Sequence, residues 1–216
     1  MTDTTVETRV PVWDPLVRFG HWALVAAFAV AYVTGEEERE PSEWHEWAGY
    51  IAGGIVVWRL IWGFVGPRRA RFSDFVVGPR QALAYLFGLF TGGARRYLGH
   101  SPAGGAMVVA LLAFLALTVA TGIAADQDGG SQATQAGQTA TARAGSPHTV
   151  QNGEGEEREG EESFIGELHG TLANITLMLA VLHILGVALA SFVHRENLAR
   201  AMITGKKRAD DASPNL

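Results

Sequence analysis

Four long apolar runs constrain this chain more than any other feature of its sequence. They extend roughly over Leu16 to Thr34, Trp47 to Val65, Gly105 to Ala125 and Ile165 to Val193. A helix of about 20 apolar residues crosses the hydrocarbon core of a bilayer, which is about 30 Å thick. The runs therefore predict an all-α fold, an integral membrane four-helix bundle. The fourth run is long enough to tilt or to project beyond the lipid.

The charges between the runs give the bundle an orientation. The connection after the second run and the C-terminal tail are basic, with Arg68, Arg69, Arg71, Arg80, Arg95 and Arg96 in the first and Arg195, Arg200, Lys206, Lys207 and Arg208 in the second. The other two connections are acidic. Because basic loops stay on the cytoplasmic side, both termini are expected there, and the acidic connections on the periplasmic side. We therefore expect a multi-pass protein of the bacterial cytoplasmic (inner) membrane, with no cleavable signal peptide.

These assignments divide the chain into five predicted segments. They are a cytoplasmic arm (1–15), three spans with the arginine-rich connection (16–125), an acidic periplasmic loop (126–163), the fourth span (164–194) and a basic cytoplasmic tail (195–216). The loop is rich in small residues and glutamate, so it predicts a disordered insertion; His148 within it is interpreted as a solvated residue. The stretch Pro79 to Phe90 predicts either an interfacial helix or an amphipathic cap on the bundle.

Two histidines lie on the fourth span, fourteen residues apart: His169 and His183. Fourteen residues return an ideal helix to nearly the same face and separate the two rings by about 21 Å along the axis. His21 and His45 lie at the starts of the first and second spans. Because successive spans run in opposite directions, His21 and His183 are expected near the cytoplasmic side. His45 and His169 are expected near the periplasmic edge.

Paired imidazoles at two depths predict two bis-histidine haems of the b type. The chain contains no cysteine, which excludes disulfides, thiolate-held iron–sulfur clusters and covalent haem attachment. Zinc is the alternative metal, but its structural sites need four converging ligands, and the two histidine levels are about 21 Å apart. The other interpretation is that each histidine is an ordinary interfacial residue at the end of a span.

Arg59 lies fourteen residues after His45, on the same face but toward the cytoplasmic side. Its guanidinium suits a haem propionate, and the alternative is an arginine that snorkels to the lipid boundary. Glycines near the histidines allow close approach of a haem plate or, equally, ordinary close packing of helices. They are Gly20, Gly49, Gly122, Gly170 and Gly186.

Several ordered motifs extend over nearly the whole chain apart from the acidic insertion and the extreme termini. They are VWDPLVRFGHW, TGEEE, WHEWAGYIAGGIVVWRLIWGFVGPRRARFSDFV, RRYLGHSPAGGAM, ELHGTLAN, LHILGV and HRENLARAMITGKKR. In these motifs the chain resembles the bacterial cytochrome b561 / Ni-hydrogenase b-type cytochrome family. The resemblance implies an integral membrane di-haem cytochrome b whose ligands are His21, His45, His169 and His183. It also implies electron transfer between a periplasmic partner and membrane quinone.

We therefore expect a respiratory electron carrier with two haem b groups. Its expected partners are the lipid membrane, quinone and a periplasmic cytochrome c or hydrogenase, and no nucleic acid. The acidic external connections favour a basic partner. His100 is a candidate for contact with a quinone, with helix capping or contact with lipid phosphate as alternatives. The rival functions are a quinone or superoxide oxidoreductase in its own right and a non-redox membrane scaffold.

Overall fold

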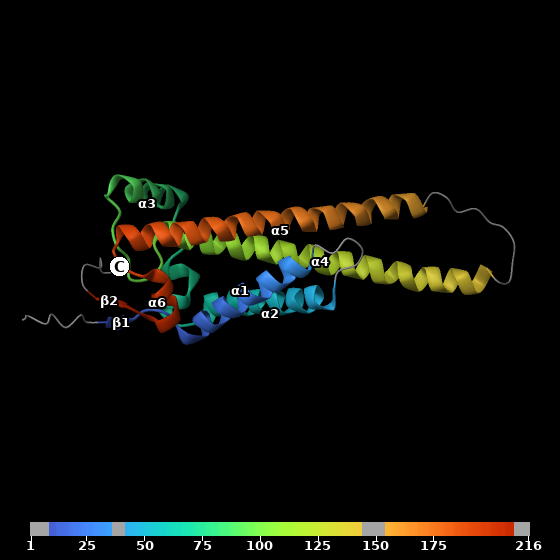
Figure 1. Ribbon diagram of the computed structural model, residues 1–216, viewed down its shortest axis with the longest axis horizontal. Helices are drawn as coiled ribbons and strands as arrows, with labels where there is room; N and C mark the ends of the chain where they lie inside the picture. The colour runs from blue at the N-terminus through green and yellow to red at the C-terminus, as the bar shows by residue number, and fades with distance from the viewer. Residues whose placement is uncertain (1–8, 36–41, 144–153, 210–216) are drawn as a thin grey trace, which may run out of the picture.

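Four long helices dominate the computed structural model of this chain (Figure 1). It describes residues 9–35, 42–143 and 154–209, with side chains described at 9–35, 42–127 and 164–209. The helices are α1 (Pro15–Thr34), α2 (Glu43–Val65), α4 (Pro102–Arg143) and α5 (Glu154–Val193). Each contains a stretch long and apolar enough to cross a membrane: Pro15–Thr34, Glu43–Val65, Pro102–Gln127 and Phe164–Val193. The predicted all-α membrane bundle of four helices is confirmed.

Local sequence signals determine where the first two helices begin. Asp14 caps α1, because its side chain accepts hydrogen bonds from the backbone N–H groups of Leu16 and Val17, and a proline follows it at the first helical position. Ser42 caps α2 by accepting a hydrogen bond from the N–H of His45. His45 therefore lies in the first turn of its helix, at one end of the bundle.

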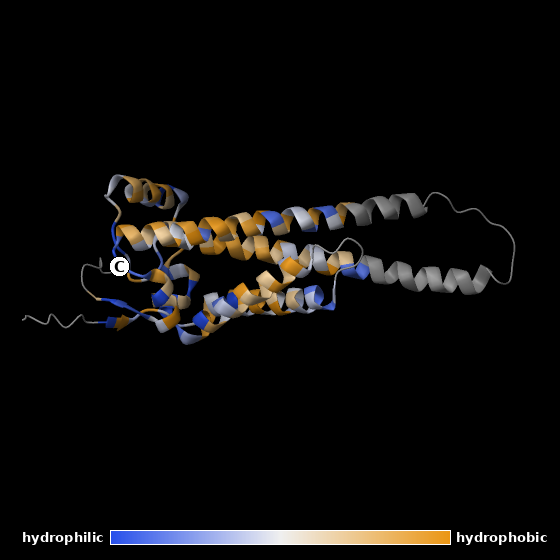
Figure 2. Cartoon of the chain, viewed as in Figure 1, coloured by the Kyte–Doolittle hydropathy of each residue, from blue (hydrophilic) through white to orange (hydrophobic). Residues whose placement is uncertain are grey.

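The helices pack as two pairs, α1 against α2 and α4 against α5, with α2 against α4 (Figure 1). The shared apolar core is small and centres on Val56, Leu112 and Leu115. Most large apolar side chains of the spans face outward, as surfaces surrounded by lipid tails do, and Figure 2 shows hydrophobic colour along the middle of the bundle. Between α1 and α5, the hydroxyl of Tyr32 donates a hydrogen bond to Asn174 Oδ1 at 2.9 Å.

The two ends of the described chain meet at one end of the bundle, which we call the cap end. Strand β1 (Arg9–Pro11) pairs antiparallel with β2 (Lys206–Arg208), and the short helix α6 (Leu198–Thr204) precedes β2. Arg18 on α1 donates hydrogen bonds to the carbonyls of Met202 and Ile203. The described parts of the predicted arm (9–15) and tail (195–209) thus belong to one folded unit, which the sequence did not predict.

The connection between α2 and α4 completes this unit. It contains the 3-10 helices η1 (Arg68–Ala70) and η2 (Phe72–Asp74) and the helix α3 (Pro79–Thr91). We call β1, β2, α6 and residues 66–101 the terminal cap. Arg96 joins its parts, because it forms a buried ion pair with Glu196 at 2.8 Å and donates to the carbonyl of Arg208 at 2.6 Å.

Helix α3 matches the stretch for which an interfacial helix or a cap was expected. It lies beside the end of α5 in Figure 1, with Ala82, Tyr85 and Leu89 buried against α4 and α5. Its opposite face exposes Phe87 and Phe90, at 75% and 77%. The helix is therefore apolar both toward the bundle and away from it, so the two interpretations describe one arrangement.

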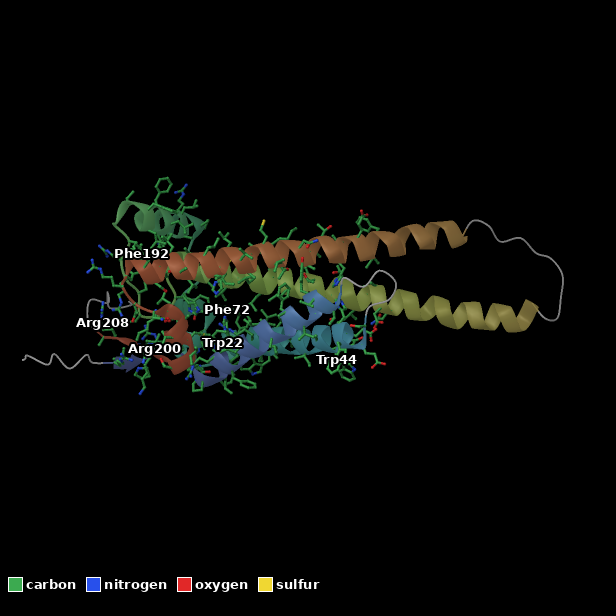
Figure 3. All side chains as sticks on the ribbon, viewed as in Figure 1. Trp22, Trp44, Phe72, Phe192, Arg200 and Arg208 are labelled. Carbon is green, nitrogen blue, oxygen red and sulfur yellow. The ribbon has the colours of Figure 1, made fainter. Side chains whose placement is uncertain are left out.

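At the opposite end of the bundle, which we call the far end, α1 ends at Thr34 and α2 begins at Glu43. Figure 3 labels Trp44 at this end and Arg200 and Arg208 at the cap end. Within the predicted insertion (126–163), α4 continues to Arg143 and α5 begins at Glu154. Residues 144–153 and the acidic residues 36–41 lie outside the described part, as does His148.

Candidate functional site

The four predicted histidines meet in two pairs, at two levels of the bundle. At the far end, the ring centroids of His45 on α2 and His169 on α5 are 5.9 Å apart, with an interplanar angle of 83°. Nearer the cap end, the rings of His21 on α1 and His183 on α5 are 6.4 Å apart, at 58°. These are the pairs that the span directions predicted.

Both centroid distances suit one metal ion between two imidazoles. A metal–imidazole bond is about 2.0 Å long and the centroid lies about 1.2 Å behind the nitrogen, so two bound rings have centroids about 6.4 Å apart. Among the described residues, no three His, Cys, Asp or Glu side chains gather into one possible metal site. A metal at either pair would need its remaining ligands from another source, and a porphyrin supplies four.

Main-chain carbonyls orient the far-end pair. The Nδ1 atom of His45 lies 2.8 Å from the carbonyl oxygen of Ala31, and that of His169 lies 2.9 Å from the carbonyl oxygen of Thr118. A carbonyl only accepts hydrogen bonds, so in both rings Nδ1 carries the proton and donates. Each Nε2 is then left with a free lone pair, the form of histidine that binds a metal.

Two glycines make room for the far-end rings. A methyl group at Gly35 would lie 2.8 Å from Cε1 of His45, and one at Gly122 would lie 2.9 Å from Cε1 of His169. Both distances are shorter than carbon atoms tolerate, so each ring occupies the space that a side chain would need. The sequence analysis named Gly122 for its position in the third span but missed Gly35, which lies in the TGEEE motif.

The cap-end pair has a different environment. His21 Nδ1 is buried and has no hydrogen-bond partner in the described part of the chain. The ring of Trp22 lies against His21 edge-on, with centroids 5.2 Å apart. Next to His21, a methyl group at Gly20 would lie 2.7 Å from the ring of Trp58 on α2. This close contact places Trp58, and Arg59 beside it, at the level of the cap-end pair.

Arg59 is a buried cation with unused hydrogen-bonding capacity. Its relative exposure is 8%, and one terminal nitrogen is buried without a partner among the described residues. The guanidinium carbon lies 4.9 Å from the centroid of the Phe72 ring. A buried charged donor without a partner is costly, so this position suits an anionic group such as a carboxylate. Its burial argues against a side chain that snorkels to the lipid boundary.

The other glycines named from the sequence face open space. A methyl group at Gly49, Gly170 or Gly186 would meet no protein atom within 4 Å. These positions do not serve contacts between the helices of this chain. They leave room for a flat group or for lipid.

A buried pair of threonines lies between the two histidine levels. Thr176, seven residues from both His169 and His183, is 1% exposed, and its hydroxyl lies 3.2 Å from that of Thr118. Each hydroxyl also donates to the carbonyl four residues earlier in its own helix. Thr118 thereby contributes its side chain to the contact between α4 and α5 and its carbonyl to His169. Sequence reasoning missed it, because a main-chain acceptor leaves no residue-type signal.

His100 lies inside the terminal cap. Its ring centroid is 4.7 Å from that of Trp13 and 4.2 Å from that of Phe75. Burial, together with the positive charges of Arg59 and Lys207, lowers the pKa of His100 to about 3. The imidazole is therefore neutral at physiological pH. His194, just after the end of α5, shares a hydrogen bond of 3.1 Å with the hydroxyl of Tyr85.

The lowered pKa of His100 predicts that acid destabilises the terminal cap. The unfolded chain takes up a proton near pH 6.5, whereas the folded cap does so only near pH 3. Stability is thus lost as the pH falls below 6.5. Glu196 adds to the loss at lower pH: burial raises its pKa, but hydrogen bonds from Arg96 and Arg208 and nearby positive charges outweigh burial and bring the pKa below 4.5. We expect the thermal midpoint to fall between pH 7 and pH 5, and to fall less in His100→Gln. Equal pH dependence in the two proteins would contradict this assignment.

One comparison with known proteins finds a match. A family model described as prokaryotic cytochrome b561 matches residues 12–205, whereas no curated protein and no solved structure matches the chain. The matched range includes all four histidines, Arg59 and most of the terminal cap. The family agrees with the four candidate spans and with the resemblance found in the motifs. The chain belongs to the prokaryotic cytochrome b561 family of membrane-embedded b-type cytochromes, which bind haem b and take part in electron transfer.

Proposed function

We propose that this chain is a di-haem cytochrome that carries electrons across the bacterial cytoplasmic membrane, between a periplasmic redox partner and the quinone pool. The observation that carries the proposal is the presence of two facing imidazole pairs, with their α5 members fourteen residues apart. Fourteen residues of helix span about 21 Å, which is most of the hydrocarbon thickness of about 30 Å. One redox site near each face provides a path that lipid alone does not.

Each histidine has a defined role in this proposal. His45 and His169 hold one haem iron at the far end, and His21 and His183 hold the other toward the cap end. The haems supply the one-electron chemistry when bound. Arg59 binds a propionate of the cap-end haem through its unpaired buried nitrogen. The packed helices keep the four rings in position.

The far end fits a basic partner. Acidic residues lie close to the outer histidine pair in the sequence: Glu43 and Glu46 are within two residues of His45, Glu167 is two residues before His169, and Asp126 is four residues after Gly122. The two carboxylates of the first turn of α2 also interact favourably with the helix dipole. A lysine-rich cytochrome c or the electron-transfer subunit of a hydrogenase would be attracted to such a surface over a long range. The basic cap end then faces the cytoplasm, as the positive-inside rule predicts.

This surface makes a prediction about the rate of electron exchange. With a basic cytochrome c as the partner, we expect the second-order rate to fall by about tenfold or more as salt rises from low to physiological levels. Glu43→Gln/Glu46→Gln should weaken that dependence, measured by stopped-flow absorbance at several ionic strengths. The matched control, Asp74→Asn, changes an acidic residue of the terminal cap and should leave the dependence unaltered. A salt-independent rate in the unmodified protein would exclude electrostatic steering.

Quinone is proposed as the second electron partner, with His100 as a residue near its site. The neutral ring lies between two aromatic side chains at the cap end, next to the positively charged Lys207. A neutral imidazole can donate to or accept from a quinone oxygen. Completion of quinone chemistry by the protein itself would make it an oxidoreductase, the second candidate function.

A reduced-minus-oxidised absorbance spectrum of the purified protein tests the proposal. We expect a b-type α band and a content of two haems per chain, measured by pyridine haemochrome assay. A membrane scaffold without redox function would be colourless after expression with adequate haem supply. One haem per chain in a fully loaded sample would also contradict the di-haem assignment.

A further inference from the structure

The two histidine pairs differ in the hydrogen bonds made by Nδ1, the ring nitrogen that is not left free to bind a metal. At the far end, His45 and His169 both donate from Nδ1 to main-chain carbonyls, at 2.8 Å and 2.9 Å. Toward the cap end, His21 Nδ1 is buried without a hydrogen-bond partner among the described residues. The chain therefore supports its two ligand pairs unequally.

A hydrogen bond from Nδ1 changes the imidazole as a ligand. It gives the ring partial imidazolate character and makes Nε2 a stronger electron donor. A stronger donor stabilises ferric over ferrous iron, so the reduction potential of a haem at that site is lower. Both rings of the far-end pair donate such a hydrogen bond, whereas Nδ1 of His21 has no partner among the described residues.

The fixed charges act in the same direction. Arg59 is 8% exposed and lies at the level of the cap-end pair, because its neighbour Trp58 contacts Gly20 beside His21. A buried positive charge stabilises the reduced state of a nearby haem site and so raises its reduction potential. The effect is strong where water does not screen the charge. At the far end the acidic residues are the half-buried Glu46, next to His45 in the sequence, and the exposed Asp126, and negative charges favour the oxidised state.

We propose that these contacts make the far-end haem site the one of lower potential and the cap-end site the one of higher potential. The inference rests on the proposed function and gives it a direction. An electron that enters at the far end moves downhill to the cap end. One site loses a single electron as the other gains it, and no proton moves and no bond breaks. Ala31, Thr118 and Arg59 are the positioning and tuning residues of this asymmetry.

A potentiometric titration of the purified, haem-loaded protein tests the order of the two sites. Followed at the α band, the protein should titrate in two one-electron steps. His169→Gln should remove the lower step and keep the higher one, and His183→Gln should do the opposite. The titration reads a potential, so it does not depend on any turnover assay.

Two further variants test the causes. Arg59→Gln should lower the higher step by about 59 mV, which corresponds to a tenfold change in the one-electron equilibrium, while Arg59→Lys should retain most of the potential. Gly122→Ala pushes the His169 ring away from Thr118 and should raise the lower step. Gly78→Ala is the matched control, because a methyl group there meets nothing within 4 Å and the residue is in the terminal cap, outside the spans. It should leave both steps unchanged.

The outcomes separate this inference from the proposed function. Suppose that the unmodified protein holds both haems. If His169→Gln then loses the higher step, or if the two steps of the unmodified protein coincide, the order of potentials is wrong but the di-haem assignment stands. If Arg59→Gln leaves both steps in place, Arg59 does not tune the cap-end site. A protein without haem would overturn the proposed function and, with it, the inference.

Discussion

Replacing any one of the four histidines is expected to remove one of the two haems, and the pairing decides which. His45→Ala and His169→Ala should lose the same spectral component, and His21→Ala and His183→Ala the other. The reason is geometric: the facing rings are 5.9 Å and 6.4 Å apart within the pairs, as two ligands of one iron require. Haem content per chain should fall from two to one in each variant, measured by haemochrome assay and low-temperature difference spectra.

The matched control for this series is His194→Ala. His194 lies after the end of α5, where it contacts Tyr85, and should be replaceable without loss of haem. Size-exclusion chromatography in detergent identifies the folded fraction, on which the haem content is measured. The pairing would be wrong if His169→Ala and His183→Ala removed one common component and spared the other.

Arg96→Met is expected to have the largest effect on the stability of the terminal cap. Arg96 and Glu196 form an ion pair in which the side chains are only 7% and 11% exposed, and Arg96 also holds the carbonyl of Arg208. Removing one partner of a buried pair leaves an uncompensated charge, at a cost of about 3–5 kcal/mol. We expect a clear drop in the thermal midpoint of the detergent-solubilised protein, measured by light scattering or by release of the haem.

Two variants serve as controls for that loss. Arg68 forms an ion pair with Asp74, but its own side chain is 77% exposed. Arg68→Met should therefore change the free energy of unfolding by only about 0–1 kcal/mol. Arg96→Met/Glu196→Met removes both buried charges and should recover part of the stability that the single variant loses. If Arg68→Met and Arg96→Met were equally stable, the buried pair would not contribute as proposed.

The four spans and the pairing of the histidines followed from the sequence, because both depend on local and periodic features. An apolar run long enough to cross a bilayer forms a helix whatever its neighbours are, and fourteen residues place His169 and His183 on one face. Span direction then assigned His45 to His169 and His21 to His183, and the structure brings these rings together. The roles of the histidines as ligands remain a proposal.

The pairing of β1 with β2 and the burial of Arg96 beside Glu196 could not be read from the sequence. The two ends were predicted as a separate cytoplasmic arm and a basic cytoplasmic tail, and residues roughly 100–200 positions apart have no periodic signal that connects them. Main-chain groups raise the same difficulty. Every residue has a main-chain carbonyl, so residue type does not mark Ala31 or Thr118 as the acceptor, and only the packing of α1 and α4 shows which ring each carbonyl meets.

The sequence by itself thus determined the helices, their directions and the depth of each histidine, since hydrophobic length and helix rise depend on nearby residues alone. Only the tertiary structure decided how each ring is supported, because that depends on contacts between helices. It supplied a carbonyl to each far-end imidazole and none to His21, and it buried Arg59 at the cap-end level. These contacts between helices, rather than the histidines themselves, distinguish one histidine pair from the other.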